Sequence, residues 1–235
     1  MIRRVVTLAL ATLAIGLGVA HAQQTITVSS NSTPIDRQVL EAITREALQR
    51  LGFGLRLVIQ PSERSLQSAN LGQVDGEGLR VEGLEKQYPN LIRVPEPYQR
   101  IAFVAFARDS SIRLDQGWTS LEPYRVGFIT GWKLFEKKVS GVRALTKVDQ
   151  PEQLFRMLEA GRIDLALYTR GDGVALARSM QMPQIVPLGP ALKEVDLYLY
   201  LNARHSALVP ELAASIRAMK ADGSHARIIA GISGD

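Results

Sequence analysis

A short segment carrying one acidic and one basic residue has the residue types that hold charged ligands. Glu77 and Arg80 lie at the end of a predicted strand, and Arg64 lies near the start of a predicted helix. An arginine at a strand end can clamp a carboxylate through two N–H···O bonds, and a helix N-terminus also favours an anion. Glu77 shares a side of the strand with Arg80 only if a bulge intervenes. We predict that all three bind ligand; solvated or ion-paired arginines, with Arg64 on Glu63, are the alternative.

A second group of candidates lies further along the chain. Thr130, Gly131, Trp132 and Lys133 stand between a predicted strand and a helix, where backbone N–H groups can receive a carboxylate and the indole can stack on a ligand. Trp132 as a core residue is the competing interpretation.

Four weaker candidates also occupy predicted strand ends. Tyr168 and Thr169 end a later strand, and Tyr168 suits either a hydrogen bond to ligand or core packing. Asn31 and Ser32 lie in the loop after the first strand. We predict that these residues complete the ligand-binding set.

Residues that would support catalysis or bind metal are scarce. The chain has no cysteine, which excludes disulfides, thiolate metal sites and a cysteine nucleophile. The segment Ser62–Ser65 does not match a nucleophile elbow. Only His205 and His225 follow the N-terminal leader, too few for a histidine-rich metal site. We therefore expect no catalytic residue, no metal and no cofactor.

The elements that would position these residues alternate between strands and helices. Apolar spacing predicts strand, helix, strand, helix and strand over residues 25–79, and a similar unit over residues 125–169. Each unit contains a Gly-x-[Val/Ile]-Asp turn, Gly72–Asp75 and Gly161–Asp164. We interpret both aspartates as structural residues that bind backbone N–H groups. Residues 101–107 and 197–201 predict two further strands.

The first 22 residues form a predicted secretory signal peptide. Arg3 and Arg4 precede an apolar run over residues 5–20, and Ala20-His21-Ala22 is an A-x-A cleavage pattern. The run is shorter than the ~20 residues that span a bilayer, which disfavours a retained anchor. Cleavage removes two arginines and lowers the formal net charge from +5 to +3, so no nucleic-acid partner is indicated. We predict a periplasmic protein.

Five short segments occur in an order and spacing that resembles a known family. They are Gly72–Asp75, Val94–Tyr98, Arg125–Phe128 with Gly131, Gly161–Asp164 and Lys220–Gly223. The chain resembles a periplasmic solute-binding protein of the polar-amino-acid type, the extracellular partner of ABC importers. The resemblance implies an α/β, type II fold of two lobes, each a mostly parallel sheet flanked by helices, joined by two hinge strands. The lobes would be residues 24–105 plus 202–235, and residues 106–201.

The resemblance also implies a function without catalysis. A monomer would capture a small solute as its lobes close, and would deliver it to an ABC permease at the inner membrane. The chain departs from the family where relatives hold an amino acid: residues 79–87 lack the Thr-x-x-Arg segment, and Thr169 replaces an acidic residue. We therefore predict a small polar or anionic solute. A dehydratase-like enzyme acting on prephenate-like acids and an orphan binder that acts with a sensor are the alternatives.

Overall fold

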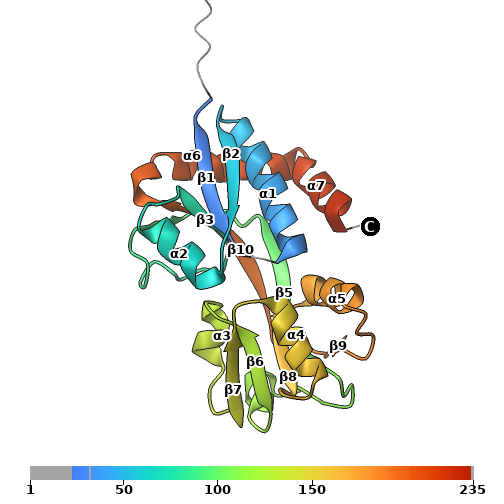
Figure 1. Ribbon diagram of the computed structural model, residues 1–235. Helices are drawn as coiled ribbons and strands as arrows, with labels where there is room; N and C mark the ends of the chain where they lie inside the picture. The colour runs from blue at the N-terminus through green and yellow to red at the C-terminus, as the bar shows by residue number, and fades with distance from the viewer. Residues whose placement is uncertain (1–22, 32, 234–235) are drawn as a thin grey trace, which may run out of the picture.

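Two long strands connect two α/β lobes, one above the other in Figure 1. The computed structural model describes residues 23–31 and 33–233. The predicted signal peptide therefore lies outside the described residues. Within those ranges no helix combines the length and the apolar character needed to cross a membrane.

The first lobe is built on a sheet with the strand order β2-β1-β3-β10. Its strands are β1 (Thr25–Ser30), β2 (Gly54–Ile59), β3 (Gly76–Arg80) and β4 (Leu91–Arg93), and its helices are α1 (Pro34–Gln49), α2 (Ser62–Asn70), the 3-10 helix η2 (Ala203–His205), α6 (Leu208–Ala221) and α7 (Ser224–Ser233). β1 pairs in parallel with β2 and β3, as the alternation of strands and helices predicts, whereas β10 is antiparallel to β3.

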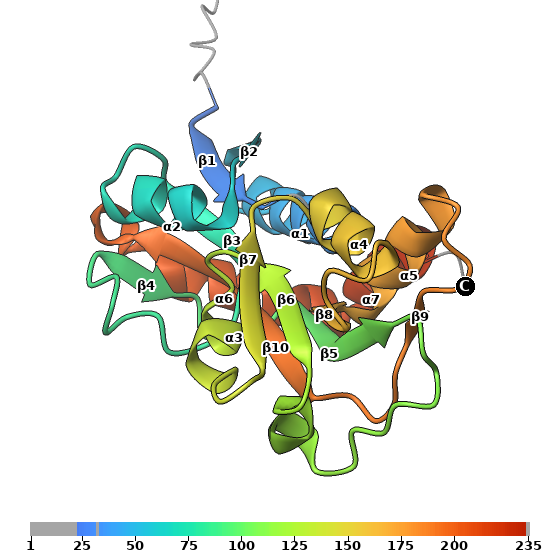
Figure 2. The ribbon, with the colours of Figure 1, turned by 60° about the horizontal axis from the view of Figure 1, so that its bottom comes forward.

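The second lobe repeats this plan with the strand order β5-β8-β6-β7. It contains β6 (Arg125–Ile129), β7 (Ala144–Val148), β8 (Leu165–Thr169), β9 (Val186–Pro187), the 3-10 helix η1 (Gly117–Leu121), α3 (Lys133–Lys138), α4 (Pro151–Glu159) and α5 (Arg170–Ser179). β6 pairs in parallel with β7 and β8, and β8 is antiparallel to β5. In Figure 2, α3 and α4 lie on opposite sides of the β6–β7 pair.

The two connecting strands are β5 (Gln99–Ala107) and β10 (Lys193–Asn202). Residues 193–197 of β10 pair with β5, whereas residues 198–202 pair with β3 and β4. One sheet of ten strands thus runs through both lobes. The observed fold confirms the predicted two-lobed α/β class. The residue bounds assigned to the lobes remain a prediction.

The two Gly-x-[Val/Ile]-Asp turns have the same structural role in each lobe. Asp75 accepts a hydrogen bond from the backbone N–H of Thr27 (2.7 Å), and Asp164 accepts one from that of Arg125 (2.8 Å). In return each aspartate donates its own N–H to the carbonyl of the same partner, at 2.8 Å in both cases. The structure therefore confirms that both aspartates are structural.

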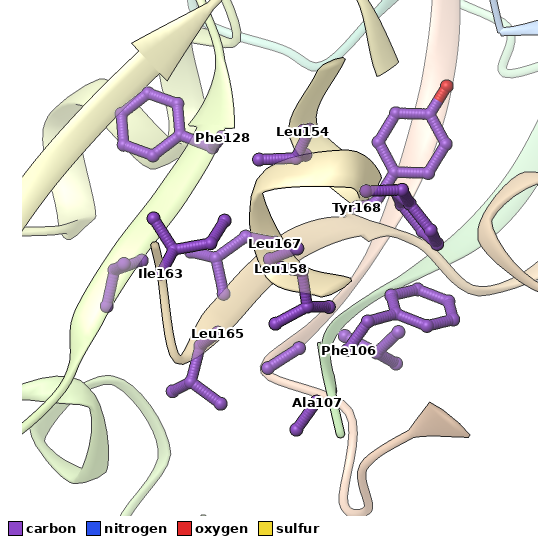
Figure 3. Close-up of a cluster of buried hydrophobic side chains, with 14 of the residues drawn as sticks. Phe106, Ala107, Phe128, Leu154, Leu158, Ile163, Leu165, Leu167 and Tyr168 are labelled. Atoms are coloured by element: carbon purple, nitrogen blue, oxygen red, sulfur yellow. The ribbon is translucent and has the colours of Figure 1, made fainter. Parts of the chain in front are cut away.

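Separate apolar cores stabilise the two lobes. In the first lobe, the side chains of β10 alternate between faces: Leu197, Leu199 and Leu201 join the core beneath α1 and α6, and Tyr200 joins the core beneath α2. In the second lobe, side chains from α4, β5, β6 and β8 meet in one buried cluster (Figure 3). Each lobe thus has its own packed interior, with the connecting strands between them.

Candidate ligand-binding cleft

A small cavity of about 40 Å³ lies where the two lobes meet. Its walls come from the loop after β1, the end of β3, the start of α3, the end of β8 and the connecting strands. The lining residues are Asn31, Thr33, Asp36, Leu79, Arg80, Val81, Leu84, Ile101, Phe103, Trp132, Lys133, Leu134, Phe135, Thr169 and Leu197. Strand ends and helix starts of open α/β sheets are the usual location of ligand sites. We therefore take this cavity as the candidate site.

A backbone irregularity brings Arg80 and Glu77 to the same side of β3. Leu79 has φ 58°, and the pairing of β3 with β10 shifts register between Tyr198 and Tyr200. Such a bulge reverses the alternation of side chains along a strand. As a result Arg80 Nε donates to Glu77 Oε1 at 2.6 Å, and Nη2 lies 2.5 Å from the same oxygen.

The guanidinium of Arg80 is almost fully engaged by the protein. Its Nη1 donates to Ser62 Oγ (2.8 Å) and to the Gly131 carbonyl (3.4 Å), and its Nη2 donates to the Ser62 carbonyl (2.7 Å). Four of its five N–H donors thus make hydrogen bonds, and the fifth belongs to Nη2 beside Glu77. The structure places Arg80 in the ion-paired arrangement rather than in a free carboxylate clamp.

Glu77 is completely buried behind the cavity. Its Oε2 accepts hydrogen bonds from the hydroxyls of Ser29 and Ser65. Burial raises the pKa of the Glu77 carboxyl, while the charge of Arg80 and the two hydroxyls act in the opposite direction. Glu77 therefore holds Arg80 in place and is not part of the cavity lining.

The start of α3 in the second lobe lies against α2 of the first, through an ion pair of Lys133 and a close approach of Gly131, both to Glu63. Lys133 Nζ lies 2.7 Å from Glu63 Oε2 across the boundary and 3.0 Å from Glu136 Oε2 on its own helix. Burial raises the pKa of Glu63, but the hydrogen bonds from Lys133 and Tyr88 leave it lower than usual overall. A Cβ at Gly131 would lie only 2.7 Å from the Glu63 nitrogen, so the close approach requires glycine.

A third contact between the lobes caps α1 with a residue from α5. Asp172 Oδ1 accepts from the N–H of Ile35 (2.7 Å), and Oδ2 accepts from the N–H of Asp36 (3.0 Å). The N-cap residue Thr33 makes no side-chain capping bond, so Asp172 takes that role from the other lobe. Sequence analysis did not identify Asp172. An acidic residue in the first turn of α5 is already explained by its favourable interaction with the start of its own helix, so the local sequence does not indicate a partner in the other lobe.

Asp36, which sequence analysis also missed, lines the cavity beside Asp172. Only 5% of Asp36 is exposed, and its Oδ1 accepts a hydrogen bond from Gln99 Nε2 at 2.7 Å. Burial, together with the negative charge of Asp172, raises the pKa of the Asp36 carboxyl well above its ordinary value. Both aspartates follow helix starts, and only the folded chain brings them together.

Trp132 forms one wall of the cavity and belongs to the aromatic core of the second lobe. Its ring stacks on Tyr168 with centroids 5.0 Å apart and an interplanar angle of 14°. The indole nitrogen is buried without a hydrogen-bond partner. Trp132 thus packs in the core, one of its two predicted roles, and also lines the cavity, while its contact with a ligand stays a prediction.

The remaining predicted residues divide between the cavity and its surroundings. Asn31 lines the cavity, and its Oδ1 accepts hydrogen bonds from the backbone N–H (3.1 Å) and the hydroxyl (2.6 Å) of Thr33. Tyr168 lines an adjoining space of about 10 Å³. Thr130 instead donates to the Val148 carbonyl (3.2 Å), and Arg64 is exposed on α2 outside the cavity lining.

Ser32 is the one predicted binding residue that lies outside the described residues. Its predicted role therefore stays a prediction.

Comparisons with solved structures support the fold, whereas comparisons of sequence find little. No family model matches the sequence. An uncharacterised protein of Shewanella oneidensis is 28% identical over 193 residues, which is 78% of this chain and 71% of the relative. A mutant of ArgBP from T. maritima has a TM-score of 0.75 at 18% identity, covering 90% of this chain and 96% of that one.

Two other solved structures have similar TM-scores to this chain. AbpA of Streptococcus pneumoniae, an amino acid ABC transporter substrate-binding protein bound to L-arginine, has a TM-score of 0.72 at 13% identity, covering 89% of this chain and 94% of that one. A histidine kinase sensor domain with similarity to periplasmic binding proteins also has a TM-score of 0.72, at 17% identity, covering 89% and 96%. The chain therefore has the two-lobed fold of periplasmic solute-binding proteins.

Proposed function

We propose that this protein is an exported solute-binding protein that captures a small solute between its two lobes. The observation that carries the proposal is the cavity at the boundary, to which both lobes contribute side chains. A site built this way couples binding to the relative position of the lobes. The solved binding proteins with the same fold support this assignment.

Ligand capture would shift an equilibrium between open and closed arrangements. Within residues 23–31 and 33–233, β5 and β10 are the strands that connect the lobes, so a small backbone change in them would separate the lobes. In the closed arrangement the boundary is held by Arg80 with Gly131, Lys133 with Glu63, and Asp172 with α1. A solute that contacts both lobes adds to these interactions and favours closure.

Of the predicted solute classes, a polar solute is better supported than an anionic one. The two cationic side chains that line the cavity, Arg80 and Lys133, already lie against carboxylates. An anion would have to compete with these internal partners. We therefore propose a small polar solute, held without metal or cofactor.

The wider setting of the protein is also part of the proposal. We propose cleavage of the 22-residue leader, residence in the periplasm as a monomer, and delivery of the solute to an ABC permease. Residues 24–105 with 202–235, and residues 106–201, would move as the two lobes.

A sensor partner is the second candidate, because one similar structure is a histidine kinase sensor domain. Deletion of the gene distinguishes an ABC importer from a sensor as the partner. Loss of solute uptake is expected for an importer, whereas loss of a transcriptional response with normal uptake is expected for a sensor.

A thermal-shift screen of purified protein tests the binding function. The screen covers amino acids, organic acids, amides, polyamines and sugars. A ligand at 100 times its Kd is expected to stabilise the fold by ~2.7 kcal/mol. Trp132→Ala, at the cavity wall, should weaken that response, whereas Arg64→Ala, exposed on α2, should not. Absence of stabilisation by every class would contradict a binding function.

The same screen tests the enzyme alternative. Prephenate-type acids are incubated with the protein and analysed by chromatography. We expect them to be recovered unchanged, and their conversion would show catalysis.

A further inference from the structure

We propose that the cleft selects an uncharged solute: an apolar ring that carries one hydrogen-bond acceptor. This inference rests on the proposed solute-binding function and names the class of solute. It follows from which groups around the cavity are already occupied and which are free.

The cations of the cleft are occupied. Arg80 has four of its N–H donors in hydrogen bonds, and the nitrogen that carries the fifth lies 2.5 Å from Glu77. Lys133 lies between the carboxylates of Glu63 and Glu136 at 2.7 and 3.0 Å. A carboxylate ligand would have to displace one of these carboxylates, and the displaced group would be left beside the incoming negative charge.

The acidic groups of the cleft are occupied as well. Both oxygens of Asp172 accept backbone N–H groups at the start of α1. Asp36 accepts from Gln99, and burial with Asp172 raises its pKa, which favours the uncharged carboxyl. An ammonium group would therefore meet a carboxyl that has to lose its proton before it can act as a counter-ion.

One buried polar atom of the cavity wall is without a partner. The indole N–H of Trp132 can only donate and makes no hydrogen bond, whereas the hydroxyl of Thr169 lies against the carboxyl of Asp36. Trp132 is only 8% exposed, so bulk water does not satisfy this N–H. A carbonyl or ring-nitrogen acceptor on the solute would satisfy the indole N–H.

The rest of the wall is apolar. Nine of the fifteen lining side chains are aliphatic or aromatic: Leu79, Val81, Leu84, Ile101, Phe103, Trp132, Leu134, Phe135 and Leu197. Such a wall favours an apolar ring over a sugar or a polyamine. The present volume of about 40 Å³ holds water but no ring, so the solute would enter the separated lobes and the loaded cleft would be wider.

Matched compounds that differ only in charge test the inference by calorimetry. The first set is benzamide, benzoate and benzylamine, and the second is nicotinamide and nicotinate. L-Phenylalanine and L-arginine represent amino acids. We expect the neutral member of at least one set to bind at least tenfold more tightly than its charged analogues and than either amino acid.

Two variants address the unpaired indole N–H. Trp132→Phe keeps an aromatic ring but removes the N–H, and Thr169→Val keeps the shape of a neighbouring wall residue but removes its hydroxyl. We expect about a tenfold loss of affinity for the neutral compound from Trp132→Phe, equivalent to ~1.4 kcal/mol. Thr169→Val should lower the affinity by less than Trp132→Phe, and the charge selectivity of the unmodified protein is the second readout if Trp132→Phe reduces folding.

The outcomes separate this inference from the function on which it rests. Tighter binding of benzoate, benzylamine or an amino acid would overturn the uncharged class but keep the solute-binding function. Unchanged affinity in a folded Trp132→Phe variant would also overturn the proposed recognition. No binding by any compound in these sets and in the thermal-shift screen would reject both proposals.

Discussion

At the scale of single residues, the cationic side chains that line the cleft are paired with carboxylates of the protein itself. Arg80 is the clearest case, because its strand-end position suits a ligand clamp, yet Glu77 and Ser62 surround its guanidinium. Breaking a buried pair by removing one partner leaves an uncompensated charge, which is costly. We therefore expect Arg80 to act mainly on stability.

Glu77→Gln tests the importance of this pair. Removal of the negative charge leaves Arg80 buried without its counter-ion, so we expect the free energy of unfolding to fall by ~3–5 kcal/mol. Urea denaturation monitored by circular dichroism measures the change. The matched control Arg64→Ala, exposed on α2, should change it by less than ~0.5 kcal/mol. Equal stability of Glu77→Gln and the unmodified protein would contradict the structural role.

Asp36 makes a separate prediction about pH. Burial, and next the charge of Asp172, raise its pKa above the ordinary 3.8, so the folded protein retains a proton that the unfolded chain releases. Stability from this group is complete below 3.8 and falls as pH rises towards the raised folded-state pKa. Asn cannot ionise, so the stability of the unmodified protein relative to Asp36→Asn should decrease with pH by up to ~1.4 kcal/mol per unit.

Urea unfolding of both proteins between about pH 4 and about pH 8 measures that difference. Glu77 and the other shifted carboxyls are present in both proteins, so their contributions cancel. A difference that stays constant over this range would show that Asp36 titrates normally.

At the scale of elements, the second lobe supplies the capping side chain for a helix of the first lobe. The start of α1 has no capping side chain of its own and receives both oxygens of Asp172 from α5. Because the cap and the helix belong to different lobes, its contribution is made only when the lobes are together. We infer that this contact favours the closed arrangement.

Asp172→Ala is expected to shift the free protein towards the open arrangement. Loss of an N-cap costs roughly 0.5–2 kcal/mol, enough to change a closed population several-fold. Small-angle X-ray scattering should report a larger radius of gyration than for the unmodified protein. Asp115→Ala, at an exposed position in the second lobe, is the control. An unchanged radius in Asp172→Ala would exclude a capping contact that stabilises closure.

The elements could be predicted largely from the sequence, but the contacts between them could not. Period-two and helical spacing, with the Gly72–Asp75 and Gly161–Asp164 turns, predict the parallel units because these signals are local. The start of α5 at Arg170 and the pairing of Asp36 with Asp172 depend on residues far apart in the chain. Of the residues predicted to bind ligand, Trp132 lines the cavity, and the prediction did not include either aspartate.

At the scale of the whole molecule, two packed lobes share one sheet through β5 and β10. Their cores are separate, whereas the boundary has a small cavity, three polar contacts and the unpaired indole N–H of Trp132. A hinge at the connecting strands would leave both cores intact while opening this boundary. The central claim is therefore that a solute binds there and closes the lobes.

The distance between the lobes in solution tests that claim most directly. Because the chain has no cysteine, Gln67→Cys on α2 and Lys137→Cys on α3 allow a donor and an acceptor dye to be attached, one on each lobe. Single-molecule energy transfer then reports the distance with and without a solute that stabilises the protein. We predict a shift of the population towards the shorter distance, with a midpoint at the Kd measured by calorimetry. A distance distribution that no solute changes, even one that binds, would contradict capture by lobe closure.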